Sequence, residues 1–251
     1  MIAKSKCKIL LMKYKISVII PAYNYGHKIA AAVASVRAQN LSNVEMVIVN
    51  DSSTDNTDEV VSRLLGNDVI YIKNMENLGV NKTINIGFKA ATGEYVCVLA
   101  ADDELPENSL VSRYEHIVAN DLDAVHGGTI SIDSEQQRYF PPLNTSLPAT
   151  IVDFLRDGSD TFGINNATFM YHIRIFERIG YRDETNTYFP HNDYEFALRT
   201  LSQCRVGLVN LPLYMYERHP NSHSDLHATN AAAVARLAKL KAQYIKLFES
   251  K

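Results

Sequence analysis

The sequence has few cysteines, no long hydrophobic run and little net charge, and each shortage excludes a class of protein. Its three cysteines, Cys7, Cys97 and Cys204, form no paired metal-binding motif, and an odd, sparse set is typical of a reducing cytosol. The apolar runs are far shorter than the roughly 20 residues that span a bilayer. A formal net charge of −3 gives no electrostatic basis for binding nucleic acid.

Two nucleotide-binding motifs are also missing. The chain contains neither G-x-G-x-x-G nor G-x-x-x-x-G-K-[ST], which argues against a dinucleotide-dependent oxidoreductase and a P-loop NTPase. It has no internal repeat and no low-complexity linker. With 251 residues, of which 46% are hydrophobic, the chain is long enough to bury one large core.

Short β-branched runs alternate with amphipathic segments through the first half of the chain. The pattern predicts strands at residues 15–20, 44–49, 69–72 and 95–99, with helices at residues 26–39, 57–65 and 80–90. This alternation is typical of right-handed crossovers in an α/β fold with a parallel sheet. In such sheets, ligands bind at the carboxyl ends of the strands.

Polar residues follow three of these strands. Tyr23-Asn24, Asp51 and Asp102-Asp103 each come just after an apolar run, so we expect them to converge on one sheet edge. Two adjacent carboxylates suit a hard divalent ion that also binds substrate phosphates. A role in helix capping is the alternative for Asp103 and for the segment that begins at Asp51.

The second half is less regular. Strands are expected at residues 124–132, 162–171, 206–209 and 213–218, and helices at residues 150–157, 172–179, 194–202 and 230–249, with a proline-rich connection at 138–148. The last helix has an apolar stripe and a basic opposite side. We expect the stripe to pack on its own domain or on a second copy of the chain, and an anionic membrane surface is the alternative.

Several ordered segments of the sequence resemble glycosyltransferase family 2. They are VIIPAYN at residues 18–24, VNDSSTD at 49–55, NLG at 77–79 and GEY at 93–95, followed by Asp102-Asp103. The resemblance covers about residues 15–225 and implies one GT-A domain over residues 1–251. Residues 12–124 would form its nucleotide-sugar half, residues 125–229 its acceptor side and residues 230–251 a C-terminal helix, while residues 1–11 are expected to be a frayed extension.

The resemblance also assigns the nucleotide site. Tyr23 and Asp51 would hold the base and ribose of the nucleotide, and Pro21 and Ala22 would shape that edge. Asn24 lies in the same motif and is assigned to the same nucleotide site.

A metal and diphosphate site is implied in the same way. Asp102 and Asp103 match the family's metal motif, whose first acid is replaced by Ala100 here, and Asp102 would also contact the nucleotide. The expected ion is Mn²⁺ or Mg²⁺. His219 would reach the metal or the diphosphate. Many members carry an arginine at position 84, and Lys82 is the nearest cation to that position in this chain.

Asp193 matches the family's catalytic base. It lies in the pattern Asn192-Asp193…Arg199, where the family has Glu-Asp…Arg. A position near a helix start would lower the pKa of its carboxyl through the helix dipole. The alternative is that Asp193 only caps that helix.

The expected function is therefore an inverting transfer of a sugar from an NDP-sugar, UDP-sugar first, to a hydroxyl acceptor. The acceptor would be a saccharide or a lipid-linked saccharide, in the synthesis of bacterial cell-surface polysaccharide or glycan. We expect a cytoplasmic protein, with peripheral contact at the inner face of the membrane as an open alternative. The second hypothesis is a catalytically degenerate nucleotide-sugar-binding protein, and the third is a sugar nucleotidyltransferase.

Overall fold

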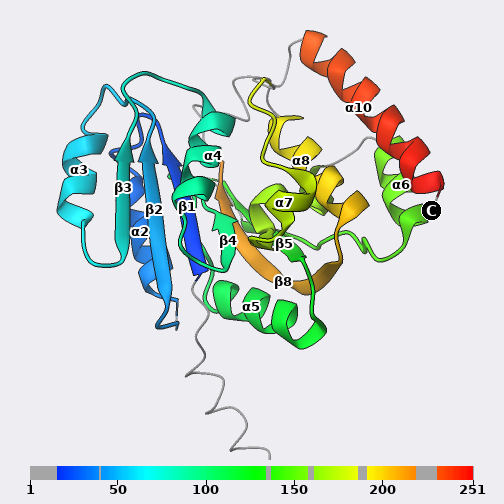
Figure 1. Ribbon diagram of the computed structural model, residues 1–251, viewed down its shortest axis with the longest axis horizontal. Coiled ribbons are helices and arrows are strands. Elements are labelled where there is room, and N and C mark those ends of the chain that lie inside the picture. The colour runs from blue at the N-terminus through cyan, green and yellow to red at the C-terminus, as the bar shows by residue number, and fades with distance from the viewer. Residues whose placement is uncertain are drawn as a thin grey trace, which may run out of the picture.

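The computed structural model describes residues 16–39, 41–133, 137–157, 161–185, 191–218 and 231–250, with the backbone only at residues 161, 162, 191, 192 and 231–234. The predicted extension at residues 1–11 lies outside this part of the chain. The described residues form an eight-stranded sheet in the order β3-β2-β1-β4-β7-β5-β6, with β8 paired to β5 (Figure 1). The strands are β1 (Ile16–Ala22), β2 (Val44–Asn50), β3 (Val69–Lys73), β4 (Tyr95–Val98), β5 (Ala124–Ile132), β6 (Gln137–Phe140), β7 (Met170–His172) and β8 (Val206–Glu217).

The first four strands form the parallel part of the sheet, as the sequence predicted. β1 pairs in parallel with both β2 and β4, and β2 pairs in parallel with β3. Successive side chains of a strand point to opposite faces, so Val18 and Ile20 pack in one buried cluster while Ile19 packs in the other. Apolar residues on both faces are typical of a strand covered on both sides.

Helices cover both faces of the sheet (Figure 1). One face packs against α2 (Ile29–Arg37), α3 (Thr57–Leu64) and α5 (Ser109–Asn120). The other packs against α4 (Val80–Ala90), α7 (Ile175–Ile179) and α8 (His191–Gln203), with α6 (Pro148–Asp157) and α10 (Ala231–Glu249) adding to the same core. The protein is therefore a three-layer α/β/α structure.

The structure joins two predicted strands into one. Residues 206–209 and 213–218 were expected as separate strands, but β8 runs continuously from Val206 to Glu217 in parallel with β5. The register of the pair shifts around Gly127 and Gly128. A Cβ atom on Gly127 would lie 2.4 Å from Cδ1 of Leu213 and 2.7 Å from the carbonyl oxygen of Val209. The glycine pair thus lets two backbones approach closely across a bulge.

The strand predicted over residues 162–171 is mostly wrong. Two short 3₁₀ turns, Thr161–Ile164 and Asn166–Thr168, precede β7, which covers only Met170–His172. The side chain of Asn165 accepts a hydrogen bond from Ala167 N at 2.9 Å, and Thr168 Oγ1 donates to Asn165 O at 2.8 Å. Such local side-chain bonds compete with a strand ladder, and apolar composition alone does not reveal them.

Two other boundaries differ from the prediction. The connection at residues 138–148 contains β6, and α2 begins at Ile29 rather than at residue 26. Gly26 N donates to Asp55 Oδ2 at 3.1 Å, so this residue serves a loop instead of the helix.

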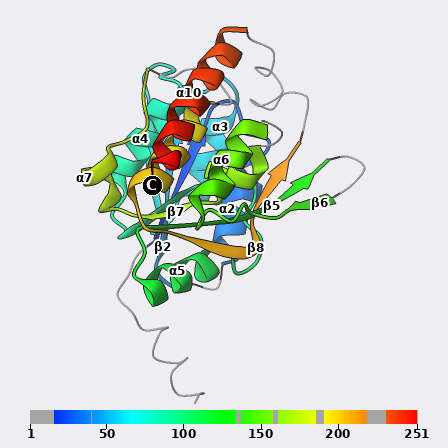
Figure 2. The same cartoon turned by 90° about the vertical axis from the view of Figure 1, so that its right-hand side faces the viewer.

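The C-terminal helix packs on its own domain, as expected. Tyr244 and Phe248 of α10 are buried in the same core as Ile151 and Leu155 of α6, and α10 lies beside α6 in Figure 2. Within the described ranges, no helix is long and apolar enough to cross a membrane.

Candidate active site

Three neighbouring parallel strands deliver polar residues to one edge of the sheet. Ala22 at the end of β1 is in register with Asn50 at the end of β2, and Asp51 N donates to Ala22 O at 2.8 Å. β4 lies on the other side of β1 and leads directly to the segment that contains Asp102. The predicted convergence of Tyr23, Asp51 and Asp102 is confirmed.

The loops after β1 and β2 are tied together by Asn24. Asn24 has a left-handed backbone with φ of 61°, and its Oδ1 accepts from Thr54 N at 2.8 Å and from Asp55 N at 3.3 Å. Its own N–H donates to Ser53 Oγ at 2.9 Å. The side chain of Asn24 therefore holds the loop in shape. Its predicted contact with a nucleotide stays a prediction.

The other residues of this motif differ in what they offer a ligand. Tyr23 is 44% exposed, so an aromatic side chain is open to solvent at this edge. Pro21 is half-buried and Ala22 is buried within β1. That these two residues shape the nucleotide site stays a prediction.

Asp51 shapes the turn that leads into α4. Its carboxylate accepts hydrogen bonds from Leu78 N and Gly79 N, both at 2.9 Å, and from Asn74 Nδ2 at 2.8 Å. Gly79 has φ of 82°, in the left-handed region that favours glycine. Lys82 follows on α4 and is exposed. Because Asp51 is only 4% exposed, its visible role is to fix this turn, and direct nucleotide binding by Asp51 stays a prediction.

The adjacent acids Asp102 and Asp103 have different surroundings. Asp103 is 4% exposed. It accepts hydrogen bonds from Tyr214 Oη at 2.7 Å and from Glu217 N at 2.9 Å. Burial and then the neighbouring Asp102 raise the pKa of Asp103 well above its ordinary value. Asp102 is half-buried and accepts a hydrogen bond from the hydroxyl of Tyr25.

The capping alternative for Asp103 is wrong. Helix α5 begins at Ser109, with Asn108 in the N-cap position. Asp103 lies well before that start and instead contacts the end of β8.

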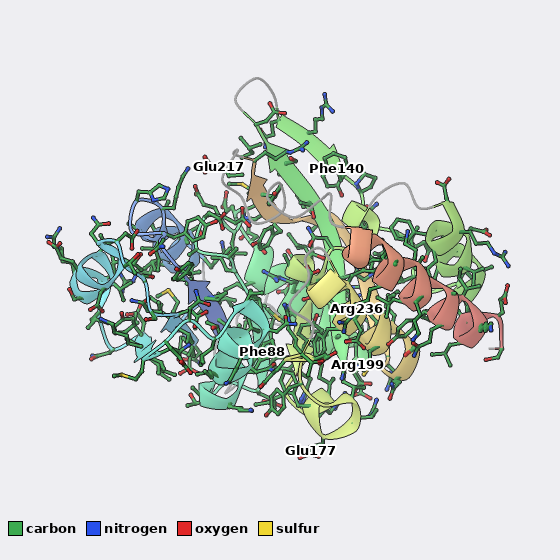
Figure 3. The ribbon with its side chains drawn as sticks, turned by 90° about the horizontal axis from the view of Figure 1, so that it is seen from above. Phe88, Phe140, Glu177, Arg199, Glu217 and Arg236 are labelled. Atoms are coloured by element: carbon green, nitrogen blue, oxygen red, sulfur yellow. The ribbon has the colours of Figure 1, made fainter. Side chains whose placement is uncertain are left out.

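The end of β8 is a part of the site that local sequence patterns do not reveal. Tyr214 and Glu217 N of this strand end both donate to Asp103. In addition, the side chain of Glu217 accepts a hydrogen bond from Lys28 Nζ at 2.5 Å. Figure 3 labels Glu217 at this end of the strand. One strand end thus contacts both the Asp102-Asp103 segment and the residues just before α2. The predicted ligand His219 lies outside the described residues.

Asp193 lies in the first turn of α8 and is partly exposed. Its carboxylate accepts hydrogen bonds from the backbone N–H groups of Asp193 and Tyr194. Burial raises the pKa of this carboxyl, and Arg182 and those N–H groups oppose the change. The expectation that the helix dipole would lower the pKa is therefore wrong, because desolvation outweighs it.

Arg182 is a site residue that the sequence reasoning missed. Arg182 is 6% exposed, and burial lowers the pKa of its guanidinium. Asp193 is the largest of the groups that raise this pKa. Tyr214, which contacts Asp103, is among the same groups. Arg182 is therefore a buried cation whose electrostatic neighbours include Asp193, the predicted base.

Arg199, the last residue of the matched pattern, braces the segment before α8. Its guanidinium donates to Ile179 O at 2.5 Å and to Tyr181 O at 3.0 Å, and it pairs with Glu195 at 2.9 Å. Arg199 thus fixes the chain that carries Arg182.

The donor set fits a divalent ion only in part. Among the residues that the structure describes, no group of three or more His, Cys, Asp or Glu side chains could hold a metal ion by itself. Asp102 is the accessible carboxylate, and Asp103 is already engaged by two donors. Mg²⁺ is commonly held by one or two carboxylates together with substrate phosphates, so the residues present fit an ion that arrives with its substrate.

Comparison with curated proteins gives relatives that are named glycosyltransferases. The chain is 28% identical over 218 residues to "Uncharacterized glycosyltransferase EpsJ" of Bacillus subtilis, which covers 84% of this chain and 63% of the relative. It is 37% identical over 147 residues to an uncharacterized glycosyltransferase of a Nostoc strain, which covers 55% of this chain and 45% of the relative. The chain therefore spans less than two thirds of either relative.

Solved structures share the fold. The crystal structure of S. aureus TarS 1-349 in complex with UDP-GlcNAc has a TM-score of 0.75 and 19% sequence identity, and the match covers 92% of this chain and 66% of that one. The expected GT-A arrangement, a mostly parallel sheet flanked by helices, is confirmed. The sequence pattern described as Glycosyl transferase family 2 matches residues 17–184. Because this match covers more than half of its residues, the chain belongs to glycosyl transferase family 2.

Proposed function

We propose that this protein is an inverting glycosyltransferase that moves a hexose or an N-acetylhexosamine from a UDP-sugar to an acceptor hydroxyl. The observation that carries the proposal is the convergence of Tyr23, Asp51 and Asp102, which follow three neighbouring parallel strands at one edge of the sheet. Tyr214 of β8 donates to Asp103 beside Asp102, and the buried Arg182 interacts electrostatically with Asp193. The related TarS structures, in complex with UDP and with UDP-GlcNAc, support a uridine donor.

The nucleotide would lie over the ends of β1 and β2. Tyr23 offers an exposed ring on which a base can stack, on a floor shaped by Pro21 and Ala22. Asp51 and Asn24 hold the two surrounding loops in place. Lys82, exposed on α4 beyond the Asp51 turn, is the cation proposed for the diphosphate.

Asp102 would hold Mn²⁺ or Mg²⁺, with Asp103 beside it and His219 as a further ligand. When bound, the ion acts as a Lewis acid that neutralises charge on the departing diphosphate. Asp103 contributes by fixing the segment to β8, which keeps Asp102 in a defined place.

Asp193 would act as the general base. An acceptor hydroxyl must lose its proton as it attacks the sugar carbon, and a base works best when its pKa lies near the working pH. Burial raises the pKa of Asp193 toward that range. Attack from the side opposite the diphosphate inverts the configuration of the sugar.

The acceptor is proposed to be a saccharide or a lipid-linked saccharide of a cell-surface polysaccharide or glycan. Its location would be cytoplasmic, at the inner face of the membrane if the acceptor is lipid-linked. Lys239 and Lys246 lie exposed on α10 and are the cations available for anionic lipid. Sedimentation with anionic and neutral vesicles tests this contact, because an electrostatic contact should be lost on neutral vesicles.

A donor screen tests the proposed function. Purified protein would be incubated with UDP-, GDP-, CDP- and dTDP-sugars and Mn²⁺, and nucleotide release would be measured against the Asp193→Asn variant as background. Release that depends on Asp193 from one UDP-sugar is the expected result. UDP binding without release from any donor would favour a catalytically degenerate binding protein. Ala100, which stands where the family has the first acid of its metal motif, supports this alternative. Pyrophosphate release from a nucleoside triphosphate and a sugar phosphate would favour a nucleotidyltransferase.

A further inference from the structure

Arg182 is a buried cation held by amide side chains. Its Nη2 donates to Asn166 Oδ1, its backbone N donates to Asn85 Oδ1 at 3.1 Å, and its carbonyl accepts from Asn85 Nδ2 at 2.9 Å. Its Nε has no hydrogen-bond partner among the described residues. A buried guanidinium is costly unless a negative group lies nearby, so this placement requires an explanation.

The geometry of α8 identifies that negative group. The Arg182 guanidinium lies over the ring of Phe196, 5.8 Å from its centroid. Phe196 follows Asp193 by three positions in the helix, so both side chains lie on one face of α8. Arg182 therefore packs against the face that carries Asp193, and Asp193 is the largest of the groups that oppose the effect of burial on the pKa of Arg182.

Among the described residues, the other titratable groups packed around α8 do not take the place of Arg182 as the cation for Asp193. Tyr171 from β7 and Tyr194 from α8 are neutral, since burial raises the pKa of both hydroxyls above the ordinary value. Glu195 and Arg199 pair with each other, and Tyr244 of α10 donates to Glu195 at 3.3 Å. They line a groove between α8 and α10, together with Arg236, which Figure 3 labels near Arg199.

A second buried arginine shows that this fold can hold a guanidinium without an acid. Arg113 is fully buried and donates to the carbonyl oxygens of Ser109, Thr168 and Phe169. Its partners are neutral, three backbone carbonyl oxygens and the hydroxyl of Ser109, whereas Arg182 packs against the helix face that carries Asp193. The two residues therefore form a natural comparison between a structural and a functional buried arginine.

We propose that Arg182 is a positioning residue for Asp193, whose buried charge keeps the carboxylate ionised and directs it toward the acceptor. This rests on the proposed function of Asp193 as the base. Asn85 holds the backbone of Arg182 and Asn166 holds its guanidinium, so this cation has a defined position. Arg182 itself is buried and needs no contact with substrate.

The test compares the pH dependence of kcat/KM for the wild type, Arg182→Gln, Arg182→Lys and Arg113→Gln. Without the cation, Asp193 should stay protonated to higher pH, so Arg182→Gln should lose roughly tenfold more activity at pH 6 than at pH 8. Arg113→Gln should be less stable but keep the wild-type profile. An acidic limb in Arg182→Gln that matches the wild type would overturn the proposal.

Arg182→Lys keeps the test decisive if Arg182→Gln does not fold. Lysine keeps the charge but cannot reproduce the geometry of the guanidinium, so the acidic limb should stay in place while kcat falls several-fold. A kcat equal to that of the wild type would rule out positioning.

A measurement without catalysis separates this proposal from the proposed function. The effect of Asp193→Asn on the free energy of unfolding would be measured from pH 5 to pH 8. It would be measured in the wild-type protein and again in Arg182→Gln or Arg182→Lys. The pH range over which Asp193 affects stability should move upward in Arg182→Gln, whether or not any donor is turned over. If it does not move, the proposal fails even for an active enzyme. If it moves but no transfer is found, only the proposed function fails.

Discussion

The hydroxyl of Tyr214 donates a 2.7 Å hydrogen bond to Oδ2 of Asp103, and the two residues lie 111 positions apart in the chain. The same hydroxyl accepts from Ala100 N at 3.0 Å. One tyrosine of β8 therefore holds both ends of the segment that carries Asp102. The second half of the chain thereby fixes the segment that carries the proposed metal site.

Tyr214→Phe should destabilise the protein by about 1–3 kcal/mol, because a buried carboxylate loses a donor. The change also removes the acceptor of the Ala100 N–H. Urea unfolding at pH 7 measures the effect. Tyr139→Phe is the control, because Tyr139 is 46% exposed and should change stability by less than about 0.5 kcal/mol. Equal stability of the two variants would mean that the Tyr214–Asp103 bond contributes nothing.

Asp102→Ala should remove the metal dependence of nucleotide binding. A ligand that binds only the folded state raises its stability, so UDP should raise the melting temperature of the wild type more with Mn²⁺ than with EDTA. In Asp102→Ala the two values should coincide. Asp68→Ala, which removes a surface carboxylate paired with Arg37, should keep the difference. If UDP shifts the wild type equally with and without Mn²⁺, the metal assignment is wrong.

The frame of the site could be predicted because it depends on local patterns. Alternating strands and helices place the residues after each strand at one edge, which brought Tyr23, Asp51 and Asp102 together correctly. The turn at Asn77–Gly79 was also expected. The pattern could not predict that this turn contacts Asp51, because the hydrogen bonds from Leu78 N and Gly79 N to Asp51 span 27 and 28 positions.

The second half of the chain could not be predicted to the same depth. Arg182 has no motif of its own, and its role depends on Asn85, Asn166 and Phe196 from three separate elements. The error on the pKa of Asp193 has the same origin. A helix dipole follows from position in the sequence, whereas desolvation depends on which segments pack around the carboxyl.

His126 should make the protein sensitive to mild acid. It is buried against Phe169 with ring centroids 5.0 Å apart, and burial lowers its pKa from 6.5 to about 4. Between these values the unfolded chain binds a proton that the folded chain excludes, so stability falls as pH drops from 6.5 toward 4, by up to about 3 kcal/mol.

His126→Phe should flatten this dependence, because phenylalanine keeps the ring contact and does not titrate. It should also lower stability at pH 7.5, where His126 is neutral in both states, since the 2.8 Å bond to Thr145 Oγ1 is lost. Urea unfolding at pH 7.5, 6 and 4.5 measures both effects. Parallel curves for the two proteins would show that His126 titrates normally.

Phe248→Ala in α10 should cost about 3–5 kcal/mol, because it opens a cavity in the core shared with α6. Phe248 is 3% exposed, whereas Leu247, its neighbour, is 39% exposed. Leu247→Ala is therefore the matched control and should have a small effect. Thermal unfolding of both variants makes the comparison. If Phe248→Ala unfolds like Leu247→Ala, the helix contributes little to the fold, and its apolar stripe is free for a membrane or a second copy of the chain.

Asp193→Asn should separate the two roles open to this residue. An asparagine oxygen can still accept the backbone N–H bonds of the first turn, so a capping role survives the change. The folded-state pKa is raised, so the ionised carboxylate opposes folding at neutral pH, and the variant should melt no lower than the wild type. A lost base should lower the transfer rate by about 10²–10⁴ while leaving the affinity for UDP unchanged. Glu195→Gln, which alters the carboxylate paired with Arg199, should keep the rate. If Asp193→Asn transfers sugar at the wild-type rate and Glu195→Gln does not, Glu195 is the base and Asp193 only supports the helix.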